Sequence, residues 1–217
     1  MADPVGFSQE NQYLAVTTPL GEDVLILQAV RGTEGLSSLF RFELEMVSED
    51  PEIDFTAIVG KTVTAVIYSA DGQTSRYIDG LVTDFSQHDS NTRLWTYRAI
   101  IRPKFWLGTR KTDCRIFQDM SVTDIIEQVL GEIGVTDYAL ETTSAYQART
   151  YCVQYNETVF DFLNRLMEDE GIFYFHRHED GKHTLVLADD ADAHAACPGM
   201  DRATYRPTGQ AGREDED

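Results

Sequence analysis

Short strand-like segments, each closed by a turn signal, follow one another through the first hundred residues and favour a β-rich fold. In residues 39–46, apolar Phe40, Phe42, Leu44 and Met46 alternate with charged or polar residues. This period of two is typical of a strand with one buried and one solvated face. Comparable segments span residues 23–30, 61–68, 76–85 and 92–102. Strands at this spacing predict an antiparallel barrel or sandwich.

Two Asp-Gly pairs predict tight hairpin turns, because the positive φ angles of such turns suit these residues. Asp71-Gly72 would turn the segment at 61–68 into the one at 76–85. Asp180-Gly181 would join residues 172–177 to residues 184–188. A two-residue turn there pairs Glu179 with Lys182 and Phe175 with Val186.

Two amphipathic helices are predicted in the second half, near residues 121–133 and 158–170. The first has apolar residues at helical spacing from Val122 to Ile133, with Ser121 as N-cap and Gly134 as the stop. The second repeats the design, with Thr158 as cap, and Glu170-Gly171 closes it. Beyond residue 189 the apolar periodicity fades, and we expect a solvated, poorly ordered acidic tail.

Length, composition and charge limit the number of domains and the kinds of partner that this chain can have. At roughly 150 residues per domain, the 217 residues fit one or two domains. The 42% of hydrophobic residues is enough for a real core and excludes an intrinsically disordered chain. Lys and Arg number 18 against 37 Asp and Glu, so the formal charge is −19. Such a surface repels phosphate backbones and anionic lipids, and we expect no nucleic-acid partner and no stable membrane anchor.

The amino terminus and the cysteines point to a reducing compartment. No basic segment followed by an apolar run opens the chain, so no signal peptide is expected. Cys114, Cys152 and Cys197 are far apart and form no C-x-x-C pair. We therefore expect cytoplasmic folding and free thiols that are buried or half-buried.

Three histidines are the candidates for a metal site. In the predicted register His176 and His178 share one face of the hairpin, and His178 lies opposite His183. Three imidazoles on one face could bind zinc and leave a position for water, as in a zinc-dependent hydrolase. The favoured alternative is that they are polar residues on the solvated side of an edge hairpin.

Other chemical signals are weak. No nucleophile-elbow, zinc-protease or phosphate-loop motif is present. The carboxylates are so numerous that pairs such as Glu168 with Glu170, or Asp189 with Asp190, arise by chance. The aromatic residues of the β-rich segment are Trp95, Tyr97, Phe105 and Trp106. We assign these aromatics to the core rather than to sugar or base stacking. The sequence thus predicts no catalytic residue, no metal site and no cofactor.

The segment from Tyr151 to Phe175, YCVQYNETVFDFLNRLMEDEGIFYF, resembles the VgrG family. These proteins are the spike and hub proteins of bacterial type VI secretion, related to the baseplate hubs and late-control proteins of contractile phage tails. Residues 36–44 and 183–190 fit the same family, and the resemblance runs from about residue 14 to residue 194. One departure is Val159, where the family commonly has an acidic residue; Asp161 would serve the same helix end.

The resemblance implies a catalytically silent structural component of a contractile injection machine. Its hub would consist of two similar barrel-like domains with small helices, which in the full-length protein assemble as a homotrimer. Three chains with two like domains each present a pseudo-sixfold face to the hexameric tube, which is made of the haemolysin-coregulated protein. Further implied partners are baseplate components and tip and effector proteins. The implied location is cytoplasmic assembly followed by delivery outside the cell.

From the residues and the resemblance together we expect a first hub domain over residues 1–105 and a second over residues 106–195, followed by a tail or truncated continuation over residues 196–217. Members of the family continue beyond this point into the rest of the hub and a needle. We therefore expect a chain that stops partway through the hub and leaves strand edges unpaired. The alternative within the family is a phage-tail baseplate hub or late-control protein.

Overall fold

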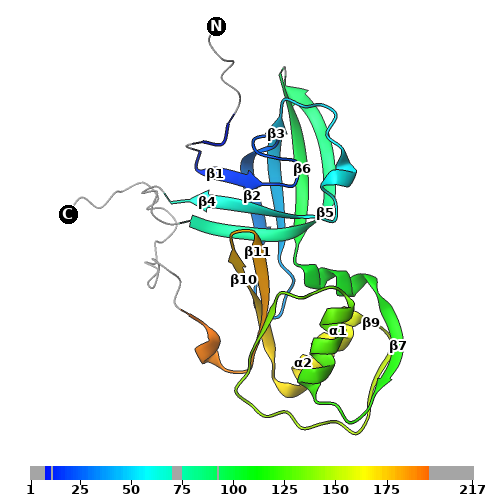
Figure 1. Ribbon diagram of the computed structural model, residues 1–217. Coiled ribbons are helices and arrows are strands. Elements are labelled where there is room, and N and C mark those ends of the chain that lie inside the picture. The colour runs from blue at the N-terminus through cyan, green and yellow to red at the C-terminus, as the bar shows by residue number, and fades with distance from the viewer. Residues whose placement is uncertain (1–7, 11, 70–74, 92, 196–217) are drawn as a thin grey trace, which may run out of the picture.

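The computed structural model describes residues 8–10, 12–69, 75–91 and 93–195. A curled sheet forms the upper part of the molecule in Figure 1, and two helices lie in the lower part. A hairpin rises from the lower part and lies against the sheet. The predicted turn at Asp71-Gly72, Cys197 and residues 196–217 of the predicted tail lie outside the described residues.

The curled sheet has six strands in the order β1-β4-β5-β6-β3-β2. All of its neighbouring pairs are antiparallel. The strands are β1 (Leu14–Thr17), β2 (Ile26–Thr33), β3 (Arg41–Ser48), β4 (Thr62–Tyr68), β5 (Ser75–Asn91) and β6 (Leu94–Arg102). The five segments predicted from periodicity therefore all form strands, although β2 begins three residues later than expected. The predicted pairing across Asp71-Gly72 is confirmed, with Tyr68 opposite Ser75.

The concave face of this sheet holds the first hydrophobic core. In β3 every second side chain is buried, which is the alternation that the sequence predicted. Tyr97 is fully buried in this core, and its hydroxyl donates to the Asp50 carbonyl at 2.7 Å. Phe105 is buried in the second core, whereas Trp95 and Trp106 are only half-buried. The aromatic residues thus divide between the core and its margin.

Two α-helices and one 3₁₀ segment surround the second core. Helix α1 (Val122–Glu132) begins with a full capping box between Ser121 and Asp124. Helix α2 (Val159–Glu170) is capped by Thr158 and ends at Gly171, whose φ of 72° is the left-handed conformation of a helix C-cap. Both helices occur where the sequence predicted them. The 3₁₀ segment at the second core is η2 (Lys104–Arg110), while η1 (Phe55–Ala57) lies beside the first core and η3 (Ala191–Ala193) lies near residue 195, where the described residues end.

The small sheets differ from an antiparallel barrel. Strand β7 (Thr112–Phe117) pairs with β9 (Cys152–Thr158) as a two-stranded ribbon. Strands β10 (Phe173–Glu179) and β11 (Lys182–Ala188) form the predicted hairpin in the predicted register. On the other side of β11, strand β8 (Tyr138–Glu141) runs parallel to it. Between β8 and β11 the chain passes through β9, α2 and β10, a crossover that local periodicity does not reveal.

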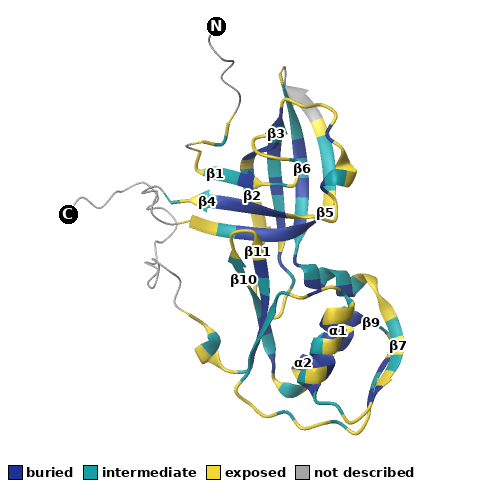
Figure 2. Cartoon of the chain, viewed as in Figure 1, coloured by how far each residue is buried: buried dark blue, intermediate teal, exposed yellow. Residues whose placement is uncertain are grey.

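The β-rich class is confirmed, with a half-barrel above and an α+β part below. Buried residues line the inside of the curled sheet and the facing sides of the helices (Figure 2). They form two clusters, one drawn from residues 16–101 and one from residues 105–187. The predicted domain boundary after residue 105 lies one residue inside the second cluster, which begins at Phe105, and it stays a prediction. Among the described residues, no helix is long and apolar enough to cross a bilayer.

Candidate functional site

The three predicted site histidines come together where the hairpin meets the half-barrel. His178 lies directly opposite His183, as predicted. The ring centroid of His183 is 6.4 Å from that of His176 and 6.4 Å from that of His178. All three rings contact Phe40 of the first core, at centroid distances between 4.8 and 5.7 Å. The histidine face of the hairpin is therefore packed against the sheet.

The ring nitrogens of His178 and His183 are directed toward separate polar groups of the surrounding chain. His183 Nδ1 lies 2.6 Å from Asp79 Oδ1, and its Nε2 accepts the backbone N–H of Lys104 at 3.0 Å. His178 Nδ1 accepts the backbone N–H of Asp79 at 3.2 Å, while its Nε2 faces Glu34 Oε2 at 3.6 Å. These bonds fix one tautomer of His183, with the proton on Nδ1.

The structure bears on both sequence-based accounts of these histidines. The zinc alternative has no geometric support, because the ring nitrogens are directed to different groups and the described residues contain no group of three or more ligands placed to hold a metal ion. The favoured prediction of a solvated hairpin face is wrong, because His183 is only 4% exposed. Sequence periodicity identified the face that the histidines share but not that β5 covers it.

Asp79 is the residue of this site that sequence analysis missed. It is 2% exposed, and its second carboxylate oxygen accepts the Thr64 hydroxyl at 2.8 Å. A carboxylate so deeply buried requires partners, and here they come from β4 and from β11. The available signal was its position between Ile78 and Gly80-Leu81, inside an otherwise apolar stretch of a strand.

The inward side of β10 carries polar rings with unsatisfied atoms. Tyr174, His176 and His178 alternate along the strand, and one side-chain nitrogen or oxygen of each is buried without a hydrogen-bond partner. Burial, followed by repulsion from His183 and His178, lowers the pKa of His176 to about 3. His176 is therefore neutral at physiological pH. This site is suited to joining two parts of the fold rather than to proton transfer.

The carboxylate pairs singled out in the sequence serve as local anchors. Asp189 accepts from Thr143, Ser144 and the hydroxyl of Tyr146, and these bonds, led by the Thr143 backbone N–H, hold its pKa well below the ordinary range. Glu170 accepts from Arg149 at 2.6 Å. Asp189 and Glu170 thus hold neighbouring segments in place.

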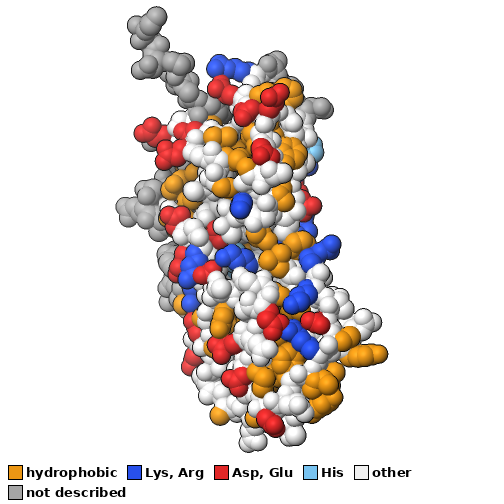
Figure 3. Space-filling view, turned by 45° about the vertical axis from the view of Figure 1, so that its right-hand side comes forward, with side chains coloured by type: hydrophobic (Ala, Val, Ile, Leu, Met, Phe, Trp, Pro, Cys, Tyr) orange, Lys and Arg blue, Asp and Glu red, His pale blue; other side chains and the backbone are white. Residues whose placement is uncertain are grey.

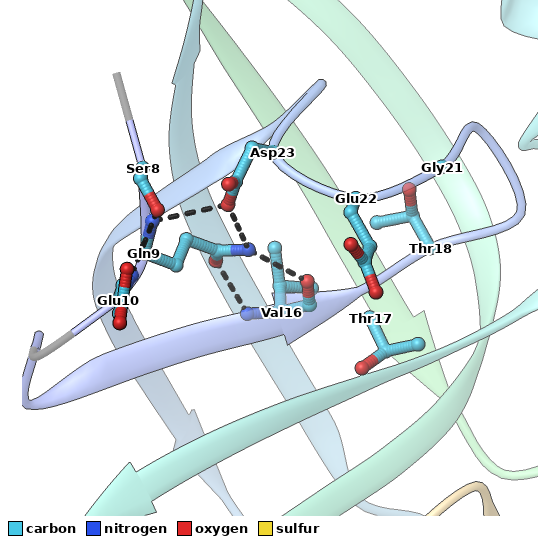
Figure 4. A pocket seen from close by; sticks show the side chains of 9 residues that line it. All are labelled: Ser8, Gln9, Glu10, Val16, Thr17, Thr18, Gly21, Glu22 and Asp23. Atoms are coloured by element: carbon cyan, nitrogen blue, oxygen red, sulfur yellow. Dashed lines mark hydrogen bonds between the residues drawn. The ribbon is translucent and has the colours of Figure 1, made fainter. Parts of the chain in front are cut away.

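A hollow of about 500 Å³ lies beside the free edges of the half-barrel (Figure 4). The Gln9 side chain spans it: its Oε1 accepts the Val16 N–H of β1 at 2.7 Å and lies 3.4 Å from the Leu27 nitrogen of β2. Its Nε2 donates to the Val16 carbonyl at 3.1 Å, and Asp23 accepts the Gln9 backbone N–H. One amide thus satisfies backbone groups of two edge strands, as a neighbouring strand would.

Exposed apolar side chains mark surfaces suited to protein contacts. On the β7–β9 ribbon the outward side chains include Ile116 and Tyr155, which are 55% and 78% exposed. Tyr151 beside them is also exposed, and Cys114, expected to be at least half-buried, is exposed there too. Cys152 faces inward and is buried, as predicted. Large apolar groups are also exposed on the half-barrel at Tyr13, Leu36, Phe55, Val59 and Tyr68.

The family model for the phage tail baseplate hub (GPD) matches residues 33–217 of this chain. Two curated proteins of Pseudomonas aeruginosa are similar over nearly the whole chain. The type VI secretion system spike protein VgrG1c is 42% identical over 97% of the chain, and VgrG1b is 40% identical over 94%. The chain spans less than a third of the length of these relatives, 29% and 27% respectively.

The fold is also similar to that of a solved type VI secretion component, the E. coli c3393 protein. The two superpose with a TM-score of 0.74 at 22% identity, over 83% of this chain and 50% of the other. That protein is itself described as similar to tail proteins of bacteriophage T4. At this identity the likeness concerns the fold alone.

Proposed function

Since the chain belongs to the phage tail baseplate hub (GPD) family, we propose that it is the amino-terminal hub portion of a type VI secretion spike. Its function would be mechanical: in the full-length protein three copies assemble, dock on the hexameric tube and carry the spike through a target membrane. The observation that carries the proposal is the family match over residues 33–217 together with 40–42% identity to two VgrG spike proteins.

Three properties of the molecule support a structural role. The histidines that looked most like a reactive site are packed between the hairpin and the sheet. Exposed aromatic and aliphatic side chains on both parts of the molecule suit large protein interfaces. The half-barrel formed by the first core would supply one of the two like domains that each of three chains needs to match a sixfold ring. A catalytic role has no comparable support.

The remaining partners and the location follow from the same proposal. Baseplate components, tip proteins and effectors would bind the assembled spike. The protein would assemble in the cytoplasm and leave the cell on the injected tube. A phage-tail baseplate hub or late-control protein is the second candidate, favoured by the description of the matching family model, and the genes beside this one would separate the two.

Light scattering and sedimentation test the proposal. We expect the full-length protein to behave as a three-chain species and to bind one hexameric ring of the tube protein. The 24.5 kDa chain is measured beside it, and we expect the three-chain species only in the longer form. A full-length protein that stays monomeric, or a trimer that does not bind the tube ring, would contradict the mechanical role.

A further inference from the structure

We propose that the surface formed by Arg102, Trp106 and Arg110, here the arginine–tryptophan face, docks an acidic segment of a partner protein. Arg102 is the last residue of β6, and the other two residues belong to η2, which connects the two parts of the fold. The inference rests on the contacts of these side chains and does not depend on the proposed function.

The indole ring holds both guanidinium groups. The Cζ atom of Arg102 lies 5.4 Å from the centroid of the Trp106 ring, and that of Arg110 lies 5.7 Å from it. Trp106 and Arg102 are half-buried, and Arg110 is exposed. Cation–π contacts of this kind restrain a long side chain without neutralising its charge. The two charges are thus held in place while their polar edges remain available.

These two arginines differ from the others in the described chain in having no carboxylate within 4.0 Å. Arg102 Nε instead donates to the Thr83 hydroxyl at 3.3 Å, and that hydroxyl donates to Asp84. The other described arginines all form such ion pairs: Arg31, Arg41, Arg76, Arg93, Arg98, Arg115, Arg149, Arg165 and Arg177.

The missing partners are notable in a chain with 37 acidic residues and 18 basic ones. The neighbouring lysines are already compensated, Lys104 by Asp137 at 3.0 Å and Lys111 by Glu132 at 3.9 Å. The local excess of charge is therefore positive, although the chain as a whole is strongly acidic. Figure 3 shows Lys and Arg side chains gathered across the middle of the visible face, with acidic side chains more frequent above and below.

The chemistry favours carboxylates on a protein segment as the occupant. A guanidinium group binds a carboxylate through two parallel hydrogen bonds, and two restrained guanidinium groups suit a segment with closely spaced Asp or Glu. A nucleic acid would bring many phosphates against a chain of charge −19, which repels such a polyanion as a whole. A short acidic segment carries far fewer charges.

Tryptophan fluorescence provides a direct test. With Trp95→Phe, Trp106 is the single remaining tryptophan. The probe is a short peptide of alternating Asp and Gly, titrated at low salt, with the same peptide carrying Asn for Asp as its neutral counterpart. We expect only the acidic peptide to bind and shift the Trp106 emission, and its affinity to fall as salt rises. Arg102→Gln with Arg110→Gln should lower the affinity at least about fivefold.

The matched control is Arg31→Gln with Arg93→Gln, which removes the same charge from two arginines that are 71% and 80% exposed. We expect this control to bind the acidic peptide nearly as well as the unchanged chain. Equal losses in the two double variants would overturn the proposal, because net charge alone would then explain binding. Equal binding of the Asn peptide, or tighter binding of inorganic phosphate than of the acidic peptide, would overturn it as well.

Discussion

Asp79 shows how one residue can join two parts of a fold. Its carboxylate accepts from Thr64 on one side and contacts His183 on the other, and its backbone N–H donates to His178. Removing one member of such a buried set leaves the others unsatisfied, which typically costs a few kcal/mol. The stability of the junction between the hairpin and the sheet therefore depends on Asp79, which belongs to β5 and not to the hairpin.

His176 makes the stability of the junction depend on pH. Its pKa is about 3 in the folded chain against an ordinary value of 6.5, so the unfolded chain binds the proton more readily. The contribution of His176 is therefore complete above pH 6.5 and is lost as the pH falls toward 3. We expect this residue alone to cost about 2 kcal/mol of unfolding free energy between pH 7.5 and pH 5, measured by urea denaturation.

The variant His176→Phe keeps an aromatic ring and removes the titrating group. Its unfolding free energy should fall less between pH 7.5 and pH 5 than that of the unchanged chain. His88→Gln, at an exposed position on β5, serves as the control and should leave the acid dependence as it is. If the unfolding free energy of His176→Phe changed with pH just as that of the unchanged chain does, groups other than His176 would be responsible for the pH dependence.

At the scale of single elements, two helix glycines should respond in opposite ways to alanine. Gly171 ends α2 with a φ of 72°, a conformation that side-chain-bearing residues adopt at a cost. Gly131 lies within α1, and a Cβ there would meet nothing within 4 Å. We expect Gly171→Ala to destabilise the chain by about 1 kcal/mol and Gly131→Ala to stabilise it by about 0.5–1 kcal/mol in thermal and urea unfolding. Effects of the same sign would contradict this account of the helix ends.

Elements that depend on neighbouring residues could be predicted from the sequence. The caps Ser121 and Thr158 and the stop at Gly171 are encoded within one helical turn of the residues they act on. The pairing of Phe175 with Val186 follows from a two-residue turn and a period of two. These features were predicted correctly because their physical causes are local.

The remaining features depend on residues far apart in the chain. Strand β8 was not predicted, because its partner β11 lies more than forty residues downstream and runs parallel to it. The histidine face seemed solvated because its cover comes from β5, about a hundred residues earlier. Strand order and burial of this kind are set by tertiary contacts, which override local periodicity.

At the scale of the whole molecule, the hairpin should couple the unfolding of the two cores. Both described α-helices surround the second core, whereas Trp95 packs on the first. In a Trp106→Phe background, circular dichroism at 222 nm reports the helices of the second core, and Trp95 fluorescence reports the first core. We expect the two urea unfolding transitions to coincide. Adding Asp79→Ala should separate them, because it removes the carboxylate that binds β5 to β11.

Asp84→Ala, an exposed acid on the same strand, is the control and should leave the transitions coincident. Separate transitions in the chain that retains Asp79 would mean that the cores unfold independently. In that case the buried contacts of the hairpin would not couple them.

The contact between Asp79 and His183 spans 104 residues, and this has a consequence for biosynthesis. A nascent half-barrel leaves the ribosome with Phe40 and the Asp79 carboxylate uncovered, because the hairpin that buries them is translated about a hundred residues later. During that interval the growing chain presents an apolar patch and an unneutralised acid to chaperones and to other nascent chains. The fraction of chains that fold correctly in the cell should therefore depend on how quickly translation proceeds from the half-barrel to the hairpin.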